Sequence, residues 1–283
     1  MPLLFVGTAA YGQTNQRRQS APLVIGVVDS IHSSILSETR VVNISFPENY
    51  ATDTTANYPV IYLLDGGVDE DFIHIAGLVK YYTTSWINRF APSIVVGIEN
   101  INRKKDFTFA TPDLRFVSQL GFDTAAFASR GGSQKFIAFI EKELQPYISK
   151  HYRATKSKTI IGESLGGLLA TEILLRKPTL FDTYIIISPS LWWGSEALLK
   201  TGNVLSTTNF TDSIKVYIGA ANKEEDNMMY KDAQQLALQL KKYGNPAMSV
   251  NFDYLPGETH ATIIHPAVYN AFKILYPVKN RKQ

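Results

Sequence analysis

Short runs of apolar residues recur along this chain and alternate with segments of helical periodicity. A run such as residues 59–64 has no polar alternation, which is typical of a strand buried on both faces of a parallel sheet. The expected strands are 59–64, 93–98, 157–161, 184–187, 214–218 and 249–254, and the expected helices are 71–89, 134–149, 165–176, 226–243 and one starting at Pro266. This alternation predicts an α/β fold: an open, mostly parallel sheet with helices on both faces.

The start of the folded part follows a different pattern. Residues 23–28 and 35–46 alternate apolar and polar side chains, which predicts an antiparallel pair at the N-terminal edge of the sheet. Residues 100–133 have little periodicity and several basic side chains, so we expect a long excursion over one end of the sheet. The chain has 283 residues, of which 45% are hydrophobic, and we expect residues 21–283 to form a single domain.

The composition excludes several classes of protein. The 28 basic and 25 acidic residues give a net charge of +3 without a long run of either sign, so we expect neither a nucleic-acid binder nor a membrane-surface protein. The chain has no cysteine, which excludes disulfides, thiolate metal sites and cysteine nucleophiles. Any nucleophile must therefore be an oxygen or a nitrogen.

The first residues bear on the compartment. Residues 2–10 are apolar and small residues follow, as in a signal peptide that lacks its basic front end. We expect residues 1–20 to be this remnant and a disordered N-terminus, and the protein to be periplasmic or secreted; a buried strand is the alternative. No apolar segment approaches the roughly 20 residues of a membrane span, so we expect none.

A Gly-x-Ser-x-Gly pattern centred on Ser164 lies between an expected strand and an expected helix. This context predicts a nucleophile elbow, in which a tight turn exposes the serine. Gly162 and Gly166 would let the strand and the helix approach closely. The alternative is a glycine-rich helix start at which the serine is only a cap.

A serine hydroxyl needs a base, and in an elbow of this kind the acid and the histidine follow the serine along the chain. His260 follows the last expected strand, whereas His265 is expected to begin the final helix. We therefore predict His260 as the base.

The third member of a triad should follow the strand at 214–218. Three carboxylates lie there, and we rank Glu224 first and Glu225 second, with Asp226 as the N-cap of the next helix. Two alternatives remain open: the carboxylates form only a solvated loop, or the site is a Ser-His dyad without a third member.

The developing oxyanion needs two backbone donors. The amide of Leu165 follows the nucleophile, and the amide of Gly67 is our second choice, although residues 64–67 could equally be a simple turn that ends a strand.

Several motifs together resemble those of the Putative esterase family of α/β-hydrolases, which includes siderophore, feruloyl and acetylxylan esterases and mycolyltransferases. The resemblance covers the chain from about Ser30 to the C-terminus, and its motifs are YPVIYLLDG (58–66), GGSQKF (131–136), ELQPYI (143–148), GESLGG (162–167) and ISPSLWW (187–193). It implies an α/β-hydrolase fold with Ser164 as nucleophile and His260 as base. Glu163 stands where the family usually has His or Glu, and we expect no effect on the chemistry.

The resemblance also implies substrate-binding residues. Trp192 and Trp193 would line or border the pocket, although both could instead be core. Members that resemble ferric-siderophore esterases carry Arg-Thr-Arg-Asp where this chain has RKKD at 103–106, so the basic character is kept and the arginine geometry is not. With Arg103 and Arg130, this loop could bind an anionic aromatic ligand such as a ferric catecholate, or it could be solvated surface; aromatic residues equally suit acylated polysaccharide.

The predicted function is therefore hydrolysis of a small-molecule or carbohydrate carboxylic ester through an acyl-enzyme, with no metal or organic cofactor. Acyl transfer to another hydroxyl uses the same residues and remains open, as does a noncatalytic binding protein. The sequence leaves the oligomeric state and the particular ester undetermined.

Overall fold

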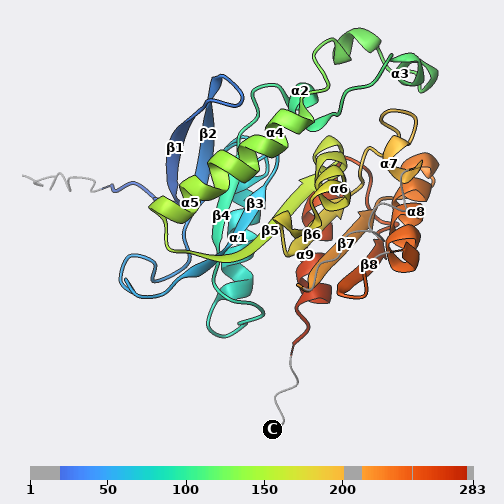
Figure 1. The fold of residues 1–283 in the computed structure, drawn as a ribbon. Helices are drawn as coiled ribbons and strands as arrows, with labels where there is room; N and C mark the ends of the chain where they lie inside the picture. The colour runs from blue at the N-terminus through green and yellow to red at the C-terminus, as the bar shows by residue number, and fades with distance from the viewer. Residues whose placement is uncertain (1–19, 201–211, 244, 279–283) are drawn as a thin grey trace, which may run out of the picture.

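The computed structural model describes residues 20–200, 212–243 and 245–278, and the predicted signal peptide within residues 1–19 lies outside them. The fold is built on an eight-stranded sheet of order β1-β2-β4-β3-β5-β6-β7-β8 (Figure 1). β2 runs antiparallel to both β1 and β4, and the other pairs are parallel, which confirms a mostly parallel sheet with an antiparallel N-terminal edge. The strands are β1 Val27–Ser33, β2 Glu38–Ser45, β3 Tyr58–Leu63, β4 Ile94–Ile98, β5 Ala154–Glu163, β6 Thr183–Ile187, β7 Ile214–Ala220 and β8 Met248–Tyr254.

Helices cover both faces of the sheet (Figure 1). The first face carries α1 and α9, and the second carries α4, α5, α6 and α8. The helices are α1 Phe72–Thr83, α2 Arg103–Phe107, α3 Arg115–Gln119, η1 Thr124–Phe127, α4 Ser133–Phe139, η2 Ile140–Leu144, α5 Gln145–His151, α6 Leu165–Arg176, η3 Pro178–Leu180, α7 Ala197–Lys200, α8 Asn227–Tyr243 and α9 Ile264–Leu275. No helix in the described ranges is long and apolar enough to cross a membrane.

The continuous apolar runs are explained by burial on both sides of the sheet. In β3, Ile61 and Leu63 pack with α1 and α9, whereas Val60 and Tyr62 pack on the opposite face. Alternate side chains of a strand point to opposite faces, so each position of a central strand needs an apolar residue. Each such side chain contributes about 1.5–3 kcal/mol when fully buried.

The first strand lies further along the chain than the sequence predicts. Leu23 and Val24 are 90% and 74% exposed and precede β1, although their alternation indicated a strand at 23–28. Asp29 within β1 accepts hydrogen bonds from the hydroxyls of Tyr147 at 2.9 Å and Tyr152 at 2.5 Å. These long-range contacts favour the later register, and local alternation could not reveal them.

The predicted helix at 134–149 is a continuous helical segment with a wider turn in its middle. The π-helical turn η2 separates α4 from α5 just before Pro146, which lies in the first turn of α5. Proline has no N–H to donate to the preceding turn, so a local change of hydrogen bonding accommodates it.

The loops that follow β3 to β8 all leave from one edge of the sheet, because these strands are parallel. The excursion at 100–133, with α2, α3 and η1, lies at the same end (Figure 1). Residues far apart in sequence can therefore meet there.

A glycine in β4 provides a test of this packing. A Cβ on Gly97 would lie 2.4 Å from the carbonyl oxygen of Gly66 and 2.6 Å from Cδ2 of Phe72. We expect Gly97→Ala to lower the free energy of unfolding by about 1–3 kcal/mol, because backbone cannot move aside easily. Gly77 of α1 is exposed and a Cβ there meets nothing within 4 Å, so Gly77→Ala should raise stability by about 0.5–1 kcal/mol. Denaturant unfolding measures both, and equal effects would contradict the close approach.

Candidate active site

Ser164 occupies a strained turn between β5 and α6. Its φ of 58° and ψ of −119° lie outside the regions that non-glycine residues prefer, a strain of about 1–3 kcal/mol. The surrounding backbone holds it there: the Ser164 amide donates to the Ile187 carbonyl at 3.0 Å, and its own carbonyl accepts from the amides of Ser190 at 3.0 Å and Leu168 at 2.9 Å.

The turn is possible because strand and helix nearly touch. A Cβ on Gly162 would lie 2.4 Å from the carbonyl oxygen of Gly166, a distance that backbone atoms cannot tolerate. Gly162 therefore does what the elbow motif predicts, since it lets the chain reverse at the edge of the sheet, where Ser164 is half-buried. A Cβ on Gly166 would instead lie 3.3 Å from Oδ2 of Asp65.

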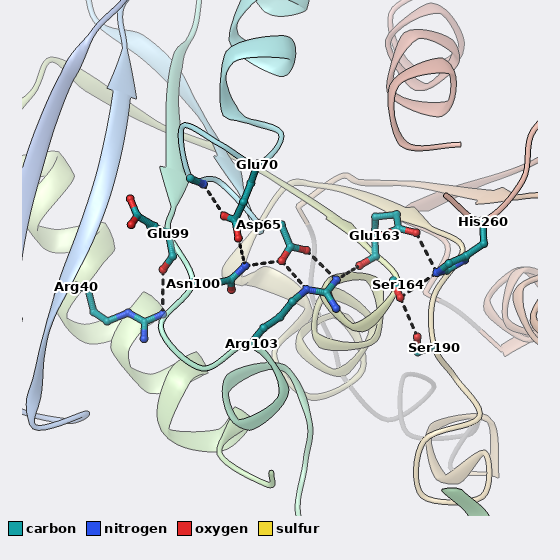
Figure 2. A network of polar contacts seen from close by, with 11 residues as sticks. Arg40, Asp65, Glu70, Glu99, Asn100, Arg103, Glu163, Ser164, Ser190 and His260 are labelled. Atoms are coloured by element: carbon teal, nitrogen blue, oxygen red, sulfur yellow. Dashed lines mark hydrogen bonds and ion pairs between the residues drawn. The ribbon is translucent and has the colours of Figure 1, made fainter. Parts of the chain in front are cut away.

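His260 reaches Ser164 from a loop distant in sequence. Its Nε2 lies 3.1 Å from Ser164 Oγ, which also lies 3.3 Å from Ser190 Oγ (Figure 2). Burial lowers the pKa of His260, against the opposing effect of Asp226 and Glu225, and Arg103 lowers it further. A neutral imidazole can accept a proton, so this geometry brings together a hydroxyl and a base.

The acidic loop is arranged differently from our first prediction. The Glu224 side chain is 80% exposed and its carboxylate lies 4.0 Å from Lys223 Nζ, so it faces solvent rather than His260. The second choice, Glu225, accepts a hydrogen bond from the backbone N–H of His260 at 2.7 Å. Asp226 accepts from the Met229 amide at 2.9 Å and is the N-cap predicted for α8. The structure thus brings Glu225 and Asp226, but not Glu224, to the histidine.

The two predicted oxyanion donors differ in availability. Leu165 is the first residue of α6, so its amide has no acceptor within the helix. The Gly67 amide instead donates to the Glu70 carboxylate at 2.6 Å, within its own turn. That choice is therefore corrected: a carboxylate three residues on takes the donor, and the glycine pattern alone did not reveal this.

A polar network joins the loop after β3 to the elbow (Figure 2). The Arg103 guanidinium binds both carboxylate oxygens of Asp65, at 2.6 and 2.9 Å, and also donates to the Glu163 carbonyl at 3.3 Å. The Asn100 amide nitrogen bridges Asp65 at 2.6 Å and Glu70 at 2.7 Å. A paired arginine fork of this kind fixes two loops relative to each other.

Ser164 and His260 line a cavity of about 430 Å³ whose wall combines aromatic rings with charged side chains. Trp192 lines it and stacks on Phe122 with ring centroids 5.3 Å apart. Trp193 is fully buried, and its indole Nε1 donates to the Phe109 carbonyl at 2.9 Å. The sequence allowed both tryptophans to line the pocket or both to lie in the core. In the structure Trp192 lines the cavity and Trp193 lies in the core.

The basic residues of the excursion contribute less than the sequence indicated. Arg103 lines the cavity, but Asp65 balances its charge. Arg130 donates to the Phe127 carbonyl at 3.2 Å and lines a separate hollow, so the prediction that it belongs to this pocket is corrected. The Lys104 ammonium lies 4.9 Å from the Phe127 ring centroid. The chain folds these cations onto its own carboxylates, carbonyls and rings.

Several residues that line the cavity were not predicted from the sequence. Phe122, Phe127 and Met229 line the wall, and Ser190 lies beside the nucleophile. Only Ser190 had a signal, because its motif follows β6 at the correct edge of the sheet. Within the described part of the chain, no group of three or more His, Cys, Asp or Glu side chains is arranged to hold a metal ion.

Comparison with known proteins identifies the family of the chain. The chain is 30% identical to the ferri-bacillibactin esterase BesA of Bacillus subtilis, over 85% of this chain and 87% of the relative. It is 26% identical to a siderophore triacetylfusarinine C esterase of Aspergillus fumigatus, over 60% and 58% of the two chains. The crystal structure of an IroE-like serine hydrolase from Shewanella oneidensis superposes with a TM-score of 0.80 at 29% identity, covering 89% of this chain and 80% of that one. Residues 33–261 match the family described as Putative esterase, and the chain belongs to that family.

Proposed function

We propose that this protein is a serine esterase that hydrolyses the ester bonds of siderophores through an acyl-enzyme. The observation that carries the proposal is the Ser164 hydroxyl, held in a strained turn 3.1 Å from the Nε2 of His260 at a cavity. The names of the relatives support siderophores as the substrate class.

The reaction follows from the positions of these groups. Ser164 Oγ attacks the ester carbonyl carbon while His260 Nε2 takes its proton, and the Leu165 amide at the start of α6 donates to the oxyanion. The proton then goes to the leaving alcohol as the C–O bond breaks. Water, deprotonated by His260, then attacks the acyl carbon. The bond to Ser164 Oγ breaks as His260 returns the proton to Oγ, which releases the acid with no further reactant needed.

The nucleophile can be tested directly. A fluorophosphonate probe should label the wild-type protein, and Ser164→Ala should abolish both labelling and hydrolysis, because the Ser164 hydroxyl is the one paired with His260 in the part of the chain that the structure describes. Ser45→Ala, at a serine that bonds the Ile25 carbonyl, is the control and should label normally. Labelling that persists in Ser164→Ala would refute the assignment.

The acidic residues can be distinguished by matched substitutions. Glu225→Gln should lower kcat/KM by about fivefold, because it replaces the charged acceptor of the His260 N–H by a neutral one, a difference of about 1 kcal/mol. Glu224→Gln removes the same charge one residue away and should leave kcat/KM unchanged. If Glu224→Gln is the more damaging change, Glu225 does not have the role proposed here.

The substrate class can be tested with a panel of esters. We expect ferric siderophore esters of the catecholate or hydroxamate type to have higher kcat/KM than p-nitrophenyl esters or feruloylated and acetylated xylan fragments. Trp192→Ala should raise the KM for the siderophore about tenfold by removing a stacking face. Trp86→Ala changes a tryptophan that is 86% exposed outside the cavity, and it should have no effect. A preference for xylan esters would overturn the substrate class.

We also propose that the protein is exported. The apolar residues 2–10 and the small residues after them support this, and cell fractionation of the full chain would test it.

A further inference from the structure

The side chain before the nucleophile faces the catalytic histidine. Glu163 ends β5, and its Oε1 lies 3.3 Å from His260 Nε2, the same atom that faces Ser164 Oγ (Figure 2). The Glu163 side chain is 18% exposed, and its Oε1 is buried without a hydrogen-bond partner. A buried polar atom without a partner is uncommon, so this oxygen calls for a physical explanation.

The charged groups around Glu163 come from α2 and from the loop between β3 and α1. Burial raises the pKa of Glu163 to about 8; Arg103 of α2 lowers it, and Asp65 and Asp71 before α1 raise it. Arg103 is already paired with Asp65, so it cannot offer Glu163 a full counter-charge. A carboxyl group in this position holds its proton near neutral pH.

We propose that Glu163 is a positioning residue that governs whether His260 can act as the base. When protonated, its carboxyl group donates to Nε2 of His260 and withholds that lone pair from Ser164. When ionised, it releases Nε2 and stabilises the imidazolium that forms as Ser164 gives up its proton. This inference rests on the proposed function, and it differs from our expectation that Glu163 leaves the chemistry unaffected.

The direction of the pH dependence follows from the charges. The base is withheld while Glu163 is protonated, so kcat/KM should rise as pH passes through the pKa of Glu163, about 8. His260 itself has a lowered pKa; the groups that face it are Glu225 and Asp226 beside α8, Arg103 of α2 and Glu163 of β5. Without Glu163, the rise of kcat/KM with pH should therefore follow the ionisation of His260, at a pH below the ordinary pKa of histidine.

The experiment compares pH profiles of kcat/KM for the wild type and Glu163→Gln, which keeps the size of the side chain and cannot ionise. A group of pKa about 8 leaves the wild type only about 3% of its plateau at about pH 6.5. Glu163→Gln should keep more than about half of its own plateau there, because it cannot ionise. That plateau should be at least about tenfold lower, because the amide N–H donates to Nε2 as the protonated carboxyl group does and no carboxylate stabilises the imidazolium. If kcat/KM of Glu163→Gln still rises with pH at the same midpoint as the wild type, the proposal is overturned.

A control separates this effect from burial in general. Glu172 of α6 is a second buried carboxyl group with a raised pKa, and it pairs with Arg176. Glu172→Gln should leave the pH midpoint of kcat/KM unchanged. If that midpoint moves as far as it does in Glu163→Gln, the result counts against a specific contact between Glu163 and His260.

A second readout does not depend on the Glu163 variant folding. In the wild-type protein, the ¹⁵N NMR shift of His260 Nε2, assigned by its loss in His260→Gln, should change at the same midpoint as kcat/KM. An Nε2 shift that is flat across that midpoint would refute the proposal. Fluorophosphonate labelling separates failure of the esterase function from failure of the role of Glu163. Wild-type protein that is unlabelled at every pH refutes the esterase function itself. Labelled wild-type protein together with an unchanged pH midpoint of kcat/KM in Glu163→Gln refutes only the role of Glu163.

Discussion

The close contact between the end of β5 and the start of α6 supports everything else at this site. Gly162 lets the two backbones come together, and hydrogen bonds with the end of β6 and with α6 hold Ser164 at a φ of 58°. The strain is tolerated because the sheet on both sides of β5 is rigid and buried. The buried sheet therefore holds the Ser164 hydroxyl in a strained turn at the cavity.

The second support is the paired Arg103 and Asp65. Their ion pair links α2 to the loop after β3, and Arg103 also contacts the Glu163 carbonyl. The same pairing explains why Arg103 cannot fully neutralise the Glu163 side chain. One interaction therefore both fixes the loops and leaves a proton-holding group beside the histidine.

Regular structure was more predictable from the sequence than the details of the site. Burial on two faces leaves a clear apolar pattern, so the parallel strands and α6 were predicted closely. The elbow motif pointed to Ser164 and the order along the chain to His260, and the structure brings the two side chains within 3.1 Å. The wrong details depend on side-chain direction: Glu224 points to solvent, the Gly67 amide is taken by Glu70, and Arg130 lines another hollow. Neighbouring residues in a loop have similar local sequence, and only tertiary contacts decide which one reaches the site.

The long excursion between β4 and α4 supplies Arg103, Phe122 and Phe127 to the cavity, whereas the nucleophile and the histidine come from other loops. Apart from Arg103, which also contacts the elbow, the excursion shapes the wall of the cavity, whereas Ser164 and His260 come from other stretches of chain. Substitutions at Phe122 or Phe127 therefore change the wall at positions that make no contact with the elbow in the interactions described above. An architecture of this kind allows related enzymes to diverge toward new esters while a single chemical apparatus is inherited unchanged.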